Sequence, residues 1–238
     1  MKSGKTQQAL DACVQLLHVG KVHECQKNLI AFDKLAPTKL ANREKLQLAN
    51  LYRRCGHFSR ALKVLHPIFH PTEILETRAR PTAEESIEYA ASLLQVGIRK
   101  EAQMLLEKLD PQLFPVSLMY RAFIAFSRWD SHQAMPLLKD YLRSTKLSEH
   151  ERLVGQLNYL AAKAAVFSNG EVIAELKSFM NPCEKLGKLR LKANATEILA
   201  QVYISVNETK EALRLLNSIS ITNTSPNEFL FVKKWQWV

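Results

Sequence analysis

The histidine and cysteine side chains of this 238-residue sequence are the first candidates for a metal site. His66 and His70 are four residues apart, the spacing of two zinc ligands on one helix face, but Pro67 lies between them and interrupts a helix. Cys55 and His57 lie two residues apart, and no second pair of ligands has metal-site spacing. We therefore expect His66 and His70 to lie in a loop and Cys55 to end a helix. We predict no metal site and no cofactor.

Other motifs that could support catalysis are incomplete. The residues Ser3-Gly4-Lys5-Thr6 match the end of a phosphate-binding loop, but the first glycine of that motif is missing. Serine, histidine and aspartate residues are present, yet no spacing groups them as nucleophile, base and orienting residue. We therefore predict that the protein is not an enzyme.

A basic stretch at residues 185–192 places four cations in eight residues, with leucines between them. Such a stretch could bind phosphates or an anionic lipid surface. No aromatic residue lies within it, which argues against stacking on single-stranded nucleic acid. The simpler interpretation is a basic connector whose leucines pack inward.

The elements that would position these residues follow a repeated pattern. A small residue is followed by an aromatic residue or Leu three positions on, a turn residue seven on and an Ala twelve on. Such a pattern predicts pairs of antiparallel helices that pack closely where the small residues meet. The copies begin at Ala49, Ala90 and Ala200, with a weaker copy that pairs Ala162 with Ala174. Their turn residues are Gly56, Gly97 and Asn207 in the three clear copies.

Local signals place some helix ends. Thr82 with Glu85, and Ser148 with Glu151, have the spacing of capping boxes at helix starts. The prolines after His66 predict that the helix beginning near residue 58 ends there and that a connector follows.

The spacing of small, aromatic and turn residues resembles the tetratricopeptide repeat family. Leu48, Ala49 and Tyr52 match its first helix, and Ala61 and Leu65 match its second. The resemblance implies an all-α fold, a right-handed α-solenoid of about five to six helical hairpins. It extends over residues 1–224, and in the partial copy at 6–35 the small positions are Cys13 and Cys25. Residues 225–238 form a separate aromatic segment that could cap the last repeat, exchange between protomers or begin a further region.

The same resemblance implies that the first helix of each hairpin lines a concave groove that binds a segment of a partner protein. The family's groove positions fall on both charged and apolar residues here. An alternative is that these side chains only pack between neighbouring helices. The predicted binding residues are Asn50, Arg53, Arg54, Ile87, Leu94, Met119, Phe123, Phe126, Tyr159 and Lys163.

Charge and composition limit the classes of partner. The formal net charge is +10, and residues 1–80 carry 14 Lys and Arg against 6 Asp and Glu, which would steer acidic partners. No window resembles a membrane span, and four cysteines without paired spacing favour a reducing cytoplasm. We predict a cytoplasmic protein-binding scaffold or adaptor. The alternatives are a ligand-responsive sensor domain and, ranked lower, nucleic-acid or other polyanion binding through the basic N-terminal third.

Overall fold

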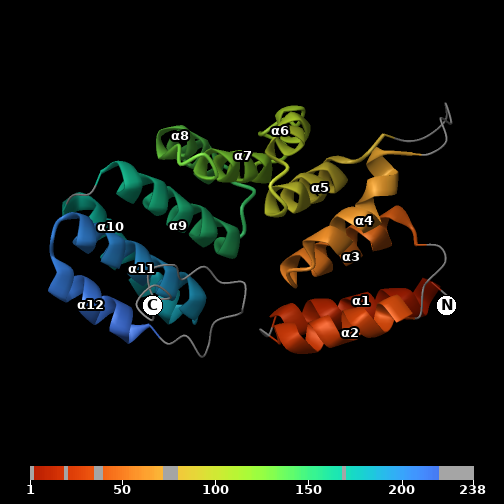
Figure 1. Ribbon diagram of the computed structural model, residues 1–238, viewed down its shortest axis with the longest axis horizontal. Coiled ribbons are helices and arrows are strands. Elements are labelled where there is room, and N and C mark those ends of the chain that lie inside the picture. The colour runs from red at the N-terminus through yellow and green to blue at the C-terminus, as the bar shows by residue number, and fades with distance from the viewer. Residues whose placement is uncertain (1–2, 19–20, 35–39, 72–79, 168–169, 220–238) are drawn as a thin grey trace. The chain divides into compact units, whose positions relative to one another are not determined.

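The computed structural model of the chain (Figure 1) describes residues 3–18, 21–34, 40–71, 80–167 and 170–219. All regular secondary structure within these ranges is α-helical, which confirms the predicted all-α helical-repeat fold. The helices belong to two compact units, Met1–Asp110 and Pro111–Val238. The first unit contains α1 (Ser3–His18), α2 (Val22–Lys34), α3 (Asn42–Arg54), α4 (Phe58–Phe69), α5 (Ala83–Gln95) and α6 (Arg99–Glu107). The second contains α7 (Val116–Phe126), α8 (Ser131–Leu142), α9 (Glu149–Val166), α10 (Gly170–Lys185), α11 (Leu189–Ser205) and α12 (Thr209–Ser218).

The aromatic segment predicted at residues 225–238 lies outside the described residues. The division of the chain into a repeat domain over 1–224 and this segment therefore stays a prediction.

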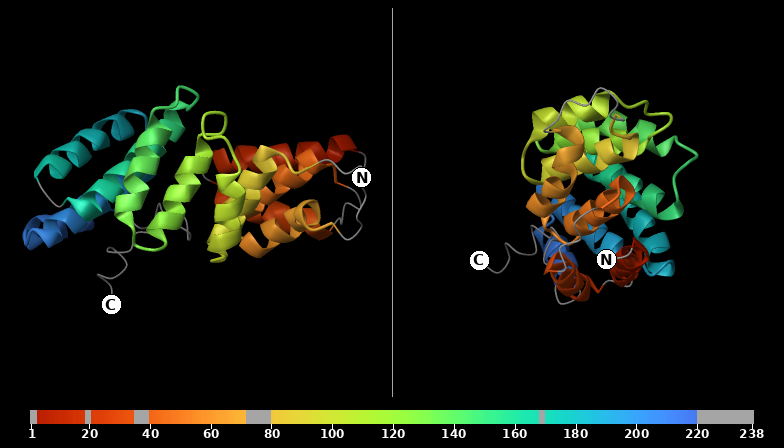
Figure 2. Two further views of the ribbon diagram at one scale, coloured as in Figure 1. Left: turned by 90° about the horizontal axis from the view of Figure 1, so that it is seen from above. Right: turned by 90° about the vertical axis from the view of Figure 1, so that its right-hand side faces the viewer.

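Small residues let the two helices of a hairpin approach closely. Ala49 of α3 and Ala61 of α4 are completely buried, as the repeat pattern predicts. In the first unit, α1, α3 and α5 also contact one another in turn, so successive hairpins stack through their first helices. Figure 2 shows the helices of this unit, coloured red to yellow, lying side by side. The other hairpins with two buried small residues pair Cys13 with Cys25, Ala90 with Ala102, Ala122 with Ala134, and Ala200 with Ala212.

The α9–α10 hairpin departs from the predicted pattern. Ala162 of α9 is completely buried, but Ala174 of α10 is exposed, so the predicted pairing of these two residues is wrong. The core-facing stripe of α10 has a different register, in which buried residues recur at the i, i+4, i+7 and i+11 spacing of one helix face. Those residues are Val172, Leu176, Phe179 and Cys183.

Helix α4 continues through Pro67, contrary to the predicted connector. Pro67 lies in the last turn of α4, where a proline removes only one backbone donor, and the His70 N–H still donates to the His66 carbonyl at 2.8 Å. Tertiary packing stabilises this turn, since the Phe69 ring stacks on Tyr89 with centroids 4.2 Å apart. The prediction of loop histidines is therefore wrong for His66, which lies in α4, and right for His70, which follows the last residue of the helix. The two rings stack with centroids 4.4 Å apart.

Both predicted capping boxes form. The Thr82 hydroxyl accepts a hydrogen bond from the Glu85 N–H at 3.2 Å, and the Thr82 N–H donates to the Glu85 carboxylate at 2.8 Å. At the start of α9, the Ser148 hydroxyl likewise accepts from the Glu151 N–H at 3.3 Å, and the Ser148 N–H donates to the Glu151 carboxylate at 2.9 Å. Each box satisfies backbone donors that the first turn of a helix leaves free.

The turns inside the hairpins use left-handed backbone. Gly56, Gly97 and Asn207, the predicted turn residues, have φ angles of 81°, 84° and 65°. The corresponding residue between α7 and α8 is Trp129, with φ of 59°. A residue with a Cβ atom is strained in this conformation, and the Trp129 side chain is 95% exposed.

Candidate partner-binding site

The ten residues predicted to bind a partner lie on the first helices of four hairpins, two hairpins in each unit. In the first unit, α3 carries Asn50, Arg53 and Arg54, and α5 carries Ile87 and Leu94. In the second unit, α7 carries Met119, Phe123 and Phe126, and α9 carries Tyr159 and Lys163. Each unit is described by itself below.

A buried carboxylate organises the charged part of the site in the first unit. Arg53 of α3 donates from Nε to Oε1 of Glu88 at 2.6 Å and from Nη2 to Oε2 at 3.1 Å. Asn50 Nδ2 donates to the same Oε2 atom at 2.8 Å. The side chains of Arg53 and Glu88 are only 18% and 7% exposed, so this network joins α3 to α5 inside the unit. Asn50 and Arg53 therefore stabilise the packing of α3 on α5 through their hydrogen bonds to Glu88.

The sequence analysis missed Glu88, although a signal for it exists. Glu88 is the only charged residue in the stretch 87–94 of α5. A lone carboxylate within an apolar helix requires a partner if it is buried. Asn50 and Arg53, three residues apart on α3, supply donors on one helix face.

The remaining predicted residues of the first unit differ in exposure. Arg54 is exposed, whereas Ile87 and Leu94 are half-buried on α5. Ile87 and Leu94 are seven residues apart and lie on one helix face. This face of α5 therefore keeps part of two apolar side chains accessible.

Helix α7 of the second unit has two distinct faces. Leu118, Ala122 and Ala125 are buried on one face. On the other, the Phe123 ring contacts Tyr120 edge-on at 5.7 Å, and it stacks at 6.5 Å between centroids with Phe126, which lies at the border of the two faces. All three aromatic residues are half-buried. The face thus presents a row of aromatic rings, which we call the α7 aromatic row (Tyr120, Phe123 and Phe126).

Part of the predicted set in the second unit also packs within it. Met119, Phe126 and Tyr159 contact the cluster formed by buried residues of α7, α8 and α9. This contact agrees in part with the alternative that the predicted residues pack between helices. Each of the three nevertheless keeps some accessible surface. The buried members of the cluster are Ala122, Ala125, Ala134, Leu138 and Ala162.

Lys163 joins α9 to α10. Its Nζ atom lies 2.7 Å from Glu171 Oε1 and 2.8 Å from Glu175 Oε1, and its side chain is only 14% exposed. Hydrogen bonds to Glu171 and then Glu175 raise the pKa of the Lys163 ammonium above its ordinary value. A partner carboxylate would have to compete with two carboxylates already in place.

The described part of the chain contains no group of three or more His, Cys, Asp or Glu residues that could hold a metal ion. Cys55 ends α3, as predicted, and its Sγ lies 3.4 Å from that of Cys25. Burial raises the pKa of the Cys13 and Cys25 thiols to about 12, so neither is a thiolate near neutral pH. These cysteines act as small packing residues between α1, α2 and α3.

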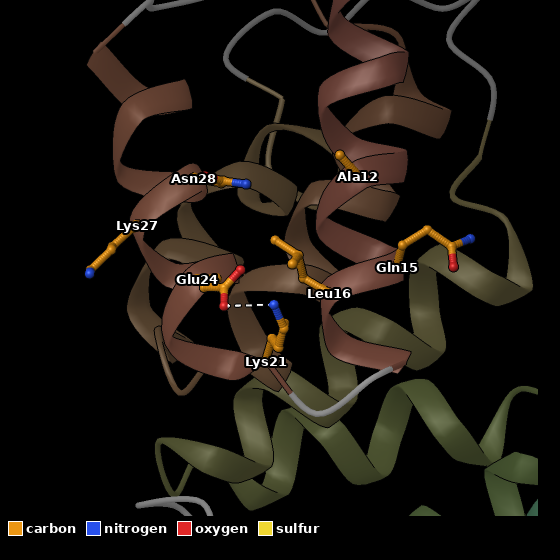
Figure 3. A pocket seen from close by; sticks show the side chains of 7 residues that line it. All are labelled: Ala12, Gln15, Leu16, Lys21, Glu24, Lys27 and Asn28. Carbon is orange, nitrogen blue, oxygen red and sulfur yellow. Dashed lines mark ion pairs between the residues drawn. The ribbon is translucent and has the colours of Figure 1, made fainter.

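A hollow of about 550 Å³ lies between α1 and α2, away from the predicted binding residues (Figure 3). Lys21 and Glu24, next to each other at the start of α2, form an exposed ion pair of 3.0 Å, while Lys27 points away from the hollow. Its lining therefore lacks the convergent polar groups of a small-molecule site.

No described helix combines the length and the apolar character that crossing a bilayer requires. No family model matches the sequence, and no protein of established function matches it in sequence.

Solved structures nevertheless share the fold. The chain is similar to the nearly identical TPR-like repeats of a kinesin light chain from Podosopora anserina, with a TM-score of 0.54, 21% identity, and coverage of 74% of this chain and 91% of that one. It is also similar to a chain of the APC/C hetero-tetramer Cut9–Hcn1, with a TM-score of 0.63, 17% identity and coverage of 94% of this chain. The match spans only 41% of that longer chain. Likeness at this identity establishes a tetratricopeptide-like helical-repeat fold.

Proposed function

We propose that this tetratricopeptide-like repeat chain is a non-catalytic adaptor that binds a segment of a partner protein. The observation that carries the proposal is the α7 aromatic row, three half-buried rings in mutual contact, of which only Phe126 also packs against the cluster of α7, α8 and α9. Aromatic residues supply much of the binding energy at protein interfaces when a partner covers them. We infer that Phe123 is the central anchor, since it contacts both other rings.

The second helix face is difficult to explain by packing within the hairpin alone. Ala122 and Ala125 already form the contact with α8 and α9, and Leu118 is buried as well. Phe126 shares in the cluster of α7, α8 and α9, but it also stacks with Phe123. A partner that covers the remaining surface of both rings would stabilise the complex through apolar burial.

The charged residues fit this proposal only in part. Asn50 and Arg53 hold Glu88, and Lys163 holds Glu171 and Glu175, so they are poorly placed to select acidic residues of a partner. Arg54 is exposed and keeps that role in the proposal. The net charge of +10 would also speed association with acidic partners at long range. We propose a cytoplasmic location, which suits the four free buried thiols.

A peptide selection followed by mutation tests the proposal. Peptides are selected from a displayed random library on the full chain, and affinities are measured for the wild type, Phe123→Asp and Phe126→Asp. We expect each charge to weaken binding by at least about tenfold, because a carboxylate in a covered apolar contact is costly to desolvate. Phe123→Leu should retain more binding than Phe123→Asp.

His132→Asp is the matched control, since His132 is an exposed residue of α8. It should leave peptide binding unchanged. Circular dichroism separates the outcomes. If Phe123→Asp unfolds, Phe123 belongs to the core, and if it folds and binds normally, the binding site lies elsewhere.

A further inference from the structure

The turn between α10 and α11 exposes two leucines to solvent. Leu186 is 42% exposed and Leu189 is 63% exposed, so the prediction that the leucines of this stretch pack inward is wrong for both. It is right for Leu191, which is buried in the core of the second unit. Gly187 lies between Leu186 and Leu189 and has φ of 65°, so the chain turns sharply there, with Leu186 just after α10 and Leu189 as the first residue of α11. An exposed leucine pair at one turn is unfavourable in water unless another surface covers it.

Cations surround the two leucines. Lys185 and Arg190 are exposed, Lys188 is half-buried, and Lys192 forms a 2.9 Å ion pair with Glu184. Glu184 is the one carboxylate within residues 184–192, against four cations. The turn therefore combines a local excess of positive charge with outward apolar side chains. We call residues 185–190 the basic–leucine turn.

This combination fits one class of surface better than others. At an anionic bilayer, leucine side chains enter the boundary of the acyl chains while lysine stems extend so that their ammonium groups stay among the lipid headgroups. A nucleic acid would use the cations but would leave the leucines exposed, and residues 185–190 contain no aromatic ring for base stacking. Charge complementarity and apolar exposure together therefore favour a lipid surface.

We propose that the basic–leucine turn is a peripheral membrane contact that binds anionic phospholipid surfaces, with Leu186 and Leu189 inserted at the interface. The contact needs no spanning helix, in agreement with the absence of one among the described residues. It lies on the α10–α11 turn, on different helices from the α7 aromatic row, so binding of a partner protein and binding to a bilayer are separate properties.

The α11–α12 turn supplies an internal comparison. Val206 in that turn is 40% exposed, nearly the same exposed fraction as that of Leu186. It is followed by Asn207 and Glu208 rather than by cations. The proposal therefore assigns membrane contact to the basic–leucine turn and none to Val206. A variant at Val206 removes exposed apolar surface without touching the proposed contact.

The test is sedimentation of the full chain with vesicles of phosphatidylcholine, with and without phosphatidylserine. We expect binding only to vesicles that contain phosphatidylserine. Lys185→Gln should weaken it about fivefold, as for one cation lost near an anionic surface. Leu186→Ser/Leu189→Ser should weaken it by at least about tenfold, because the apolar insertion is lost while all cations remain. Val206→Ser should bind like the wild type.

Since the chain is basic overall, binding that depends on charge alone must be distinguished from the proposal. If the double leucine variant binds phosphatidylserine vesicles as tightly as the wild type, the leucines do not insert and the proposal is wrong. It is equally wrong if the wild type fails to bind these vesicles at low salt, or if Val206→Ser reduces binding as much as the leucine variant does. Because Leu186, Leu189 and Val206 are all exposed, circular dichroism should show an unchanged helical fold for Leu186→Ser/Leu189→Ser and for Val206→Ser.

Discussion

Gly155 of α9 lies directly against the ring of Tyr141 of α8. A Cβ atom at position 155 would lie 2.5 Å from Cε1 and 2.8 Å from Cδ1 of Tyr141. Tyr141 is completely buried, and its hydroxyl donates to the Glu151 carbonyl oxygen at 3.3 Å. A glycine inside a helix costs about 1 kcal/mol relative to alanine, so the close packing of α8 on α9 offsets an unfavourable local choice.

We predict that Gly155→Ala lowers the free energy of unfolding by about 2 kcal/mol, because overpacking against a buried ring exceeds the gain in helix propensity. Urea unfolding followed by circular dichroism measures this change. Gly170→Ala is the control, since a Cβ atom there meets nothing within 4 Å, and it should cost nothing. In a Tyr141→Leu background the cost of Gly155→Ala should largely disappear. An equal cost in both backgrounds would show that the ring is not the obstacle.

Features set by neighbouring residues could be predicted from the sequence. The capping boxes at Thr82 and Ser148 formed because their donors and acceptors are three residues apart. The burial of the alanines in most hairpins was predicted from the fixed spacing of small residues between the two helices of one hairpin. The rule that a proline ends a helix failed at Pro67, because the packing of Phe69 on Tyr89 stabilises the turn that the proline weakens.

Pairings between distant residues could not be predicted in this way. Glu88 lies 35 residues from Arg53 and 38 from Asn50, and no local spacing indicates that the three meet. For the candidate site, the sequence could not show that Arg53 and Lys163 already pair with carboxylates of neighbouring helices. The role of the α7 aromatic row in binding stays a prediction.

Trp129 gives a prediction of increased stability. Its φ of 59° strains any residue with a Cβ atom, and its 95% exposed side chain can contribute little packing. Trp129→Gly should therefore raise the free energy of unfolding by about 1 kcal/mol, while Trp129→Ala, which keeps the Cβ atom, should change it little. Urea unfolding followed by far-ultraviolet circular dichroism measures both. A less stable Trp129→Gly would show that the indole makes contacts that stabilise the α7–α8 turn.

The Glu88 network gives a prediction of decreased stability. Glu88→Gln removes the carboxylate charge that faces the largely buried Arg53 guanidinium, and we expect a loss of about 3 kcal/mol in the free energy of unfolding. The control is Asp140→Asn, which breaks the exposed 2.7 Å pair with Arg143 and should cost about 0.5 kcal/mol. The double variant Glu88→Gln/Arg53→Met should recover part of the loss. No recovery would mean that the carboxylate matters through Asn50 rather than through Arg53.

The buried thiols give a prediction for alkaline pH. Cys13 and Cys25 have pKa values raised by burial from 9.0 to about 12 in the folded chain. Between these values the unfolded chain releases thiol protons that the folded chain retains, so the free energy of unfolding falls as pH rises. The contribution of the two protonated thiols to the free energy of unfolding is complete below pH 9 and is lost as pH approaches 12. Between these values, each thiol lowers the free energy of unfolding by about 1.4 kcal/mol per pH unit.

The slope can be assigned to the thiols by mutation. Urea unfolding under reducing conditions is measured at several values between about pH 8 and pH 11 for the wild type and for Cys13→Ala/Cys25→Ala. Burial also raises the pKa of Tyr141 to about 12, so the variant keeps part of the alkaline loss. Its slope above pH 9 should nonetheless be shallower, because two groups that retain protons only in the folded state are gone. An unchanged slope would show that Cys13 and Cys25 ionise as readily in the folded chain as in the unfolded one, and that α1, α2 and α3 pack less tightly around them than the structure shows.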